Sequence, residues 1–234
     1  MQLKNLFTTK RIGFIAIFAV LVLIGKNINF SPLVGAENQF FTLFQFFGPI
    51  AGGFLGAIFG AIAVLFAELI DFFIVGKEAS LVDILRLAPM IFATYYFGTK
   101  KKNWGIAVPI IAILAFILHP VGREVWFFTL FWTIPIIGKL LPKKYSYNIL
   151  VKSYGATFAA HAVGGALWIW TIPMTAGQWI ALIPVVFVER FLFGAGIAVS
   201  YVAFNVLFDK ALDKLKIKVP ADVLRIEKRF TLKA

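Results

Sequence analysis

The sequence predicts an all-α integral membrane protein, a helical bundle of about eight transmembrane segments. Hydrophobic residues make up 61% of the 234 residues and charged residues only 15%, which is too little polar surface for a water-soluble fold. Apolar runs of bilayer-spanning length recur from residue 12 to residue 207 with short polar breaks. Lysine and arginine gather in some of these breaks and avoid others, as is typical of multi-pass membrane proteins.

Each predicted segment is an apolar run bounded by glycine, proline or charge. Residues 12–25 follow a basic start without a small-residue cleavage site, so we interpret them as a retained first span. Residues 38–74 are too long for one span, and Gly48-Pro49 divides them because proline cannot continue a helix. The predicted segments are residues 12–25, 38–47, 50–74, 81–98, 104–118, 125–141, 149–171 and 177–208.

The basic residues predict that both ends of the chain face the cytoplasm. With the N-terminus inside, 18 of the 23 lysines and arginines fall on the cytoplasmic side, as the positive-inside rule requires. If residues 38–74 formed one span, the Lys100–Lys102 run would move outside, so the charge pattern supports the break. The sequence therefore predicts a multi-pass protein of the cell membrane.

The predicted organisation is one transmembrane domain, residues 1–208, followed by a basic cytoplasmic tail, residues 209–234. Spaced leucine, isoleucine and valine among the charges of the tail fit an amphipathic helix that lies on anionic lipid or docks a partner. A solvated tail that serves only topology fits equally well. The formal charge of +12 lies in loops and tail, so no nucleic-acid partner is expected.

Residues 46–71 hold the most distinctive pattern. Gly52, Gly56 and Gly60 recur at intervals of four, which predicts a smooth helix face where another backbone can approach closely. This spacing also occurs in membrane helices that serve packing alone, so it does not by itself indicate a function.

The order of parts around this pattern resembles the substrate-binding S components of energy-coupling factor vitamin transporters. Those proteins commonly carry a segment of the type GP-x-x-G-x-x-x-G with an acid near its end. Here the matching residues are Gly48, Pro49, Gly52 or Gly53, Gly56, and Glu68 or Asp71. Residues 164–207 resemble the closing helical pair of that family, and together these regions cover about two thirds of the chain. An extra hairpin between about residues 104 and 141 is inserted into the six-helix core of the family.

The resemblance implies a membrane protein that captures a small vitamin-like or planar molecule from outside for transport. It also implies that Gly52, Gly56 and Gly60 form a packing or coupling face. Transport would then need partners, a T-type transmembrane subunit and ATPase subunits, because the sequence contains no phosphate-binding loop of the Walker type.

Four charged residues predict a polar region near the outer leaflet. Glu68 and Asp71 end one predicted segment, and Asp83 and Arg86 lie three apart at the start of the next, hence on one helix face. A charge at mid-bilayer costs about 2.5–3.5 kcal/mol or more, so such groups face the bundle interior. They fit a structural ion-pair cluster or the floor of a substrate pocket.

Aromatic and amide residues extend this candidate site. Trp168 and Trp170 flank an outer loop, where they fit either an interfacial aromatic belt or stacking on a flat ligand. Asn38 and Gln39 of the first outer loop could cover the pocket. His161 lies near the middle of a predicted span, either hydrogen-bonded to a neighbouring helix or in contact with a ligand.

Catalytic and metal-binding readings have little support. The chain has no cysteine and no pair of histidines at metal-ligand spacing, so we expect no metal, no cofactor and no enzyme activity. Two alternatives to substrate capture stay open. The protein could be a structural or assembly subunit of a larger membrane complex, or an intramembrane enzyme on a lipid-linked substrate with His161 and Glu189 as acid and base.

Overall fold

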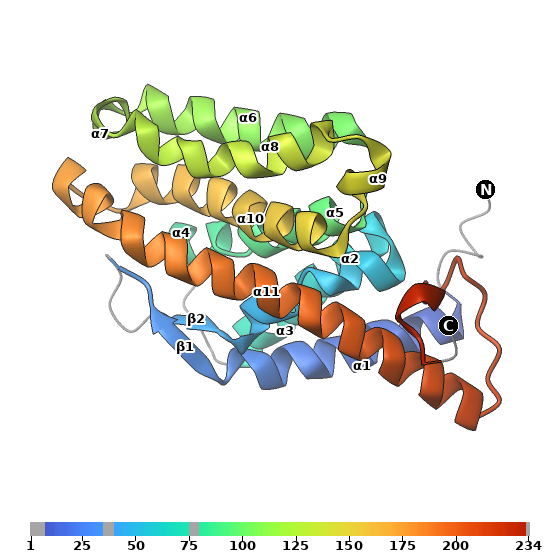
Figure 1. The fold of residues 1–234 in the computed structure, drawn as a ribbon. Helices are drawn as coiled ribbons and strands as arrows, with labels where there is room; N and C mark the ends of the chain where they lie inside the picture. Colours follow the sequence, from blue (N-terminus) through green and yellow to red (C-terminus); the bar gives the residue numbers. More distant parts are fainter. Residues whose placement is uncertain (1–7, 35–39, 75–79, 233–234) are drawn as a thin grey trace.

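The computed structural model describes residues 8–34, 40–74 and 80–232, and it is a bundle of helices with one small β-hairpin (Figure 1). This confirms the predicted all-α class. The elements in chain order are α1 (Thr9–Lys26), β1 (Asn29–Pro32), β2 (Phe40–Thr42), η2 (Leu43–Phe46), α2 (Ile50–Leu55), α3 (Ala57–Ile74), α4 (Leu81–Leu85), α5 (Ala88–Gly98), α6 (Lys102–Leu118), α7 (Pro120–Glu124), η3 (Trp126–Trp132), α8 (Thr133–Leu140), α9 (Lys143–Ser146), α10 (Ile149–Thr171), α11 (Ala176–Lys214) and η4 (Lys228–Phe230).

Side-chain caps define where the long helices begin. The Thr8 hydroxyl accepts a hydrogen bond from the Arg11 amide at the start of α1, and the Asn148 side chain accepts one from Leu150 in α10. At α11, Thr175 and Gln178 form a reciprocal capping box. Each cap satisfies amide groups that the first turn of a helix leaves without a partner.

Several helices have the length and composition of membrane spans. Within the described parts of the chain, three are long and apolar enough to cross a bilayer, residues 57–74, 81–98 and 176–214, and residues 102–118 and 126–140 form shorter apolar helices. The 39 residues of α11 extend about 58 Å, more than a bilayer core requires. These features are consistent with association with a membrane.

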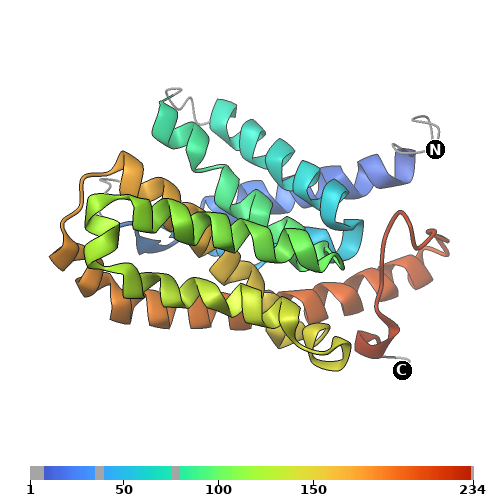
Figure 2. The ribbon, with the colours of Figure 1, turned by 90° about the horizontal axis from the view of Figure 1, so that it is seen from above.

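Helix α10 lies at the centre of the bundle. It contacts α5, α11, α6 and α8, and small residues such as Gly155 and Gly165 let Tyr96 and Trp132 approach its backbone. Helices α6 and α8 lie side by side as a hairpin against it (Figure 2). This pair corresponds to the segment that the sequence suggested as an inserted hairpin.

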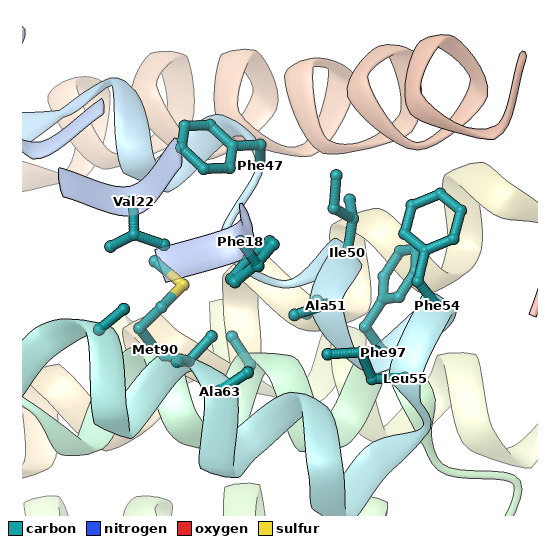
Figure 3. Close-up of a cluster of buried hydrophobic side chains, with 14 of the residues drawn as sticks. Phe18, Val22, Phe47, Ile50, Ala51, Phe54, Leu55, Ala63, Met90 and Phe97 are labelled. Atoms are coloured by element: carbon teal, nitrogen blue, oxygen red, sulfur yellow. The ribbon is translucent and has the colours of Figure 1, made fainter. Parts of the chain in front are cut away.

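The buried side chains form two clusters. The first joins α1, α2, α3, α5, α10 and α11, and Figure 3 shows part of it, where Phe18 and Val22 of α1 lie above Met90 and Ala63. The second joins α6, η3, α10 and α11 around Phe116, Phe128 and Trp132. Residues of both clusters line the cavity described below.

The chain turns back at Gly56, and not at Gly48-Pro49 as the sequence suggested. Pro49 has ordinary helical angles, φ −62° and ψ −22°, as the N-cap of α2. Gly56 has φ 85° and ψ 163°, a conformation essentially limited to glycine. Beyond it, α3 packs against α2 so closely that a Cβ at Gly60 would lie 2.5 Å from the Gly52 amide nitrogen.

The single smooth helix face predicted for Gly52, Gly56 and Gly60 is therefore wrong, because Gly52 lies in α2 and Gly60 in α3. Gly52 also faces α5, where an added Cβ would lie 2.0 Å from the Thr94 carbonyl oxygen. Close packing of small residues holds α2 between α3 and α5.

The tail folds back onto the bundle. Helix α11 continues past residue 208 to Lys214, and Val223 and Leu224 are buried further on. The Arg225 amide donates to the Phe54 carbonyl at 2.8 Å. Asn205 and Glu227 exchange two hydrogen bonds, from the Asn205 side-chain amide to the Glu227 carbonyl at 2.6 Å and from the Glu227 amide to Asn205 Oδ1 at 2.9 Å.

Candidate functional site

A cavity of about 170 Å³ lies between the two hydrophobic clusters, towards the end of the bundle where α11 begins. It is mostly apolar, with a small number of polar and charged groups in its wall, as is typical of small-molecule sites. The wall comes from the β1–β2 hairpin, α3, α4, α5, η3, α10 and α11. Its polar, charged and aromatic wall residues include Phe41, Gln45, Glu68, Arg86, Phe128, His161, Trp168, Trp179, Glu189 and Arg190.

Glu189 and Arg190 provide a buried ion pair in the wall formed by α11. Their side chains are 7% and 3% exposed, and Arg190 Nη2 lies 3.4 Å from Glu189 Oε2. Ser31 of β1 donates from its hydroxyl to Glu189 Oε1 at 2.5 Å. Burial of two charges is tolerated here because each finds a partner.

The hairpin also covers Arg190 with aromatic rings. The Arg190 guanidinium lies 4.4 Å from the ring centre of Phe41 and 4.9 Å from that of Phe193. Phe193 in turn contacts the rings of Phe30 and Phe46 edge to face. These contacts fix the hairpin against α11, so residues far apart in the sequence close one side of the cavity.

His161 of α10 is held in one tautomer. The indole nitrogen of Trp132 donates to His161 Nδ1 at 3.1 Å, so in the neutral ring the proton is on Nε2. Phe128, Phe131 and Phe158 surround the imidazole edge to face. The ring thus keeps Nε2–H as a donor at the cavity wall.

Trp179 supplies an aromatic face. It is 2% exposed, packs on Phe116 and Phe128 with ring centres 5.0 Å apart in both cases, and lines the cavity. Its indole N–H has no hydrogen-bond partner within residues 8–34, 40–74 and 80–232, and the same holds for Arg190 Nε. A buried donor without a partner is destabilising. Both nitrogens are covered by protein atoms, so a ligand in the cavity would meet the aromatic face of Trp179 and not its N–H group.

Glu68 and Arg86 complete the charged wall. Glu68 of α3 is buried, and Arg86 at the end of α4 lies within electrostatic range of Glu68 and Asp83. Together with Glu189 and Arg190, the cavity wall holds two acids and two bases. Its formal charge is therefore balanced, which favours a neutral or zwitterionic ligand over one with a large net charge.

The structure brings together four of the predicted binding residues, Glu68, Arg86, His161 and Trp168, in the wall of one cavity. It places three others elsewhere. Asp71 forms an ion pair with Lys26 at 2.8 Å, Asp83 bonds to Ser80 at the start of α4, and Trp170 donates its indole N–H to the Ala115 carbonyl at 2.9 Å. Asn38 and Gln39 lie outside the described residues. The four-membered cluster of Glu68, Asp71, Asp83 and Arg86 is thus divided.

Some wall residues were missed as binding candidates by sequence reasoning. Glu189 and Arg190 carried a usable signal, because two charges inside an apolar helix require a buried function or partner. Trp179 gave only a position near an outer loop. Phe41 and Gln45 gave no signal, since they reach the cavity through the path of the hairpin.

The side chains present can bind and orient a small molecule through donors, acceptors and aromatic faces. Within the described residues there is no group of three or more histidine, aspartate or glutamate side chains that could hold a metal ion. His161 and Glu189, the acid and base of the enzyme hypothesis, both line the cavity. The arrangement is therefore suited to binding a small molecule. It also brings together the two residues of the enzyme hypothesis, which substitution of His161 would test.

Comparison with known proteins adds one relative. No family model and no solved structure matches this chain. The chain is 25% identical over 206 residues to a protein of Methanocaldococcus jannaschii described as uncharacterized protein MJ0923. The alignment covers 80% of this chain and 69% of that relative, so the similarity extends over most of both proteins and assigns no activity.

Proposed function

We propose that this chain is a multi-pass protein of the cell membrane that captures a small, planar, vitamin-like molecule from outside, as a transport protein similar to an S component. The observation that carries the proposal is the cavity, where the His161 donor, balanced charges and aromatic faces converge on one partly open space. Such a set matches the few well-placed polar groups in an apolar wall that define small-molecule sites.

The arrangement of basic segments supports the proposed topology. The segments before α6 and around α9 lie at the same end of the bundle as the start of α1 and the end of α11 (Figures 1 and 2). These segments carry Lys100–Lys102, Lys143 and Lys144. Under the positive-inside rule that end faces the cytoplasm. The proposed topology has eight membrane segments, with residues 40–55 counted as one short segment.

The same topology places the cavity in the outer half of the bundle. Trp168 near the end of α10 and Trp179 near the start of α11 both line it, and both helix ends lie away from the basic end (Figure 1). A ligand from outside would therefore reach the cavity without crossing the cytoplasmic half.

The volume limits the ligand. A cavity of about 170 Å³ is close to one of about 150 Å³ that holds benzene, so the part of the ligand held inside it has on the order of ten non-hydrogen atoms. The wall favours a flat apolar body that stacks on Trp168, Phe128 or Trp179, with an acceptor for the Nε2–H group of His161. Balanced wall charges favour a neutral or zwitterionic molecule.

The proposed partners follow from the resemblance alone. A T-type transmembrane subunit and ATPase subunits would supply the energy for release, because the chain has no nucleotide-binding loop of its own. Membrane lipid surrounds the bundle, and the exposed leucine, isoleucine and phenylalanine side chains on α3 and α11 form a surface suited to it.

The direct test is to denature the purified full-length protein and identify released small molecules by mass spectrometry. The identified molecule, or else a panel of flat heterocycles of about the same size, is then added to ligand-free protein while thermal unfolding is followed. We expect stabilisation that is weakened in Trp179→Phe and retained in Trp126→Phe, because Trp126 is exposed away from the cavity. Absence of a released molecule and of stabilisation by the whole panel would contradict substrate capture.

A further inference from the structure

A cluster of basic side chains lies at the end of the bundle opposite the cavity. We call Lys100, Lys152, Arg225 and Arg229 the basic cluster. Lys152 lies in the first turns of α10, Lys100 follows α5, and the two arginines belong to the folded-back tail. Three separate parts of the chain therefore bring positive charge to one place.

Lys152 is the centre of this cluster. Its ammonium lies 4.4 Å from the ring centre of Phe97 and 5.3 Å from that of Tyr201. Within the described parts of the chain, no carboxylate lies within ion-pair distance of it. Aromatic faces stabilise a cation only in part, and a largely buried ammonium without an anion is energetically costly.

The one acid nearby is already engaged. Arg225, Arg229 and Lys100 are within electrostatic range of Lys152, as is Glu227. Glu227 Oε1 accepts a hydrogen bond from the Tyr201 hydroxyl at 3.0 Å, and Oε2 accepts one from Arg229 Nε at 2.7 Å. With four cations and one carboxylate, the group keeps a formal charge of +3. The protein therefore has few carboxylates here that would compete with an added anion for the cations.

The tail holds this cluster in place through backbone contacts. The Arg225 amide bonds to the Phe54 carbonyl, Glu227 is held twice by Asn205, and Arg229 Nη2 donates to the Tyr147 carbonyl at 3.3 Å. The cations are therefore already brought together before any ligand arrives, which reduces the entropy cost of binding an anion.

We propose that the basic cluster binds a phosphate group, contributed by an anionic lipid headgroup or by a free phosphate compound. Lys152 and Arg225 are the principal contacts, and Lys100 adds charge. Phosphate fits because it offers several strong acceptor oxygens to ammonium and guanidinium donors at once. Exposed Leu150 and Leu207 on α10 and α11 give the same end of the bundle an apolar surface for acyl chains.

This inference is independent of the ligand of the cavity. The test uses the full-length protein in detergent, with short-chain phosphatidylglycerol, phosphatidylcholine or inorganic phosphate as probes. Thermal unfolding and native mass spectrometry measure stabilisation and bound molecules. The variants are Lys152→Gln and Arg225→Gln, with Lys144→Gln as a control, because Lys144 is an exposed lysine of α9 at the same end and outside the cluster.

We expect phosphatidylglycerol to stabilise the wild type, with the half-effective concentration raised roughly tenfold in Lys152→Gln and Arg225→Gln, as loss of one charge-assisted hydrogen bond predicts. Lys144→Gln should match the wild type. Stabilisation by inorganic phosphate as well would identify a soluble phosphate as the source, and its absence would identify lipid.

The proposal is overturned if both cluster variants respond to phosphatidylglycerol as the wild type does, or if Lys144→Gln weakens the response equally. The second outcome would mean that overall positive charge attracts the lipid. If Lys152→Gln does not fold, Arg225→Gln decides, because the Arg225 side chain is exposed and its removal leaves the core intact. Equal stabilisation by phosphatidylcholine, whose headgroup has no net charge, also overturns the proposal.

Discussion

Replacement of Gly56 by alanine tests where the chain turns back between α2 and α3. At φ 85° and ψ 163°, a residue with a Cβ is strained by about 1–3 kcal/mol. Alanine also loses less entropy on folding, which offsets about 0.4–1 kcal/mol. An added Cβ would lie 2.9 Å from Arg225 Nη2, but the exposed end of that side chain can move. At the middle of both ranges the expected net loss is roughly 1.3 kcal/mol.

The assay is thermal unfolding of the detergent-solubilised protein, followed by the fluorescence of its six tryptophans. A loss of this size lowers the unfolding temperature by several degrees in a protein of this length, at roughly 2–4 °C per kcal/mol. Gly56→Asn should be destabilised about as much, because asparagine tolerates the left-handed helical region near ψ 47° but not ψ 163°.

Two matched variants isolate the backbone effect. Gly13→Ala in α1 should be stabilising by roughly 0.5–1 kcal/mol, since a Cβ there meets nothing within 4 Å. Pro49→Ala should cost less than about 1 kcal/mol, because Pro49 has ordinary helical angles. The reasoning would be refuted if Gly56→Ala left the unfolding temperature unchanged, or if Pro49→Ala lowered it more than Gly56→Ala does. Either result would favour a chain reversal at Gly48-Pro49.

Three further predictions concern the bundle and its orientation. Lys139→Met should lower the free energy of unfolding by roughly 2–3 kcal/mol in chemical denaturation, because its buried ammonium bonds to the carbonyls at the end of α5. Trp132→Phe should cost about 1–2 kcal/mol and weaken ligand binding, since His161 loses the donor that fixes its tautomer; unchanged binding would exclude this role. In this cysteine-free chain, a membrane-impermeant maleimide should label Arg123→Cys on intact cells, and Lys101→Cys only after the membrane is opened. The reverse pattern would contradict the proposed topology.

Most helices could be predicted because hydrophobic runs, and the glycine, proline and charged residues that bound them, are local properties of the sequence. The run at residues 149–171 coincides with α10, and the run at 177–208 begins within one residue of α11. These two helices begin directly after the N-cap residues Asn148 and Thr175, whose side chains bind backbone amides within a few positions. No tertiary contact is needed to recognise them.

The reversal was misplaced because glycine and proline give ambiguous local signals. Proline breaks a helix interior but is tolerated at a helix start, which is where Pro49 stands. Gly56 looks like one member of a helical packing face, yet it takes a conformation that excludes continued helix. Its role depends on α2 packing against α3 and α5, a contact that spacing alone does not contain.

The candidate site was predicted only in part, since ionisable residues signal burial without naming their partners. Glu68 and Arg86 line the cavity, but Asp71, one helical turn from Glu68, reaches Lys26 of α1. The choice between the two acids depends on which neighbour each faces, and three residues along a helix are enough to change it. A membrane interior demands a partner for every charge and does not specify which one.

Glu189 and Arg190 show how strongly the site depends on distant contacts. Adjacent helical residues point about 100° apart, so their positions in the sequence did not predict that they would share a partner. Their long side chains nevertheless reach one another, with 3.4 Å between Nη2 and Oε2. Ser31 and Phe41 of the hairpin then occupy the remaining faces of the pair. Because a segment about 150 residues earlier in the chain completes this environment, the two charges are a pair in the wall of the cavity and not two isolated charges in an apolar helix.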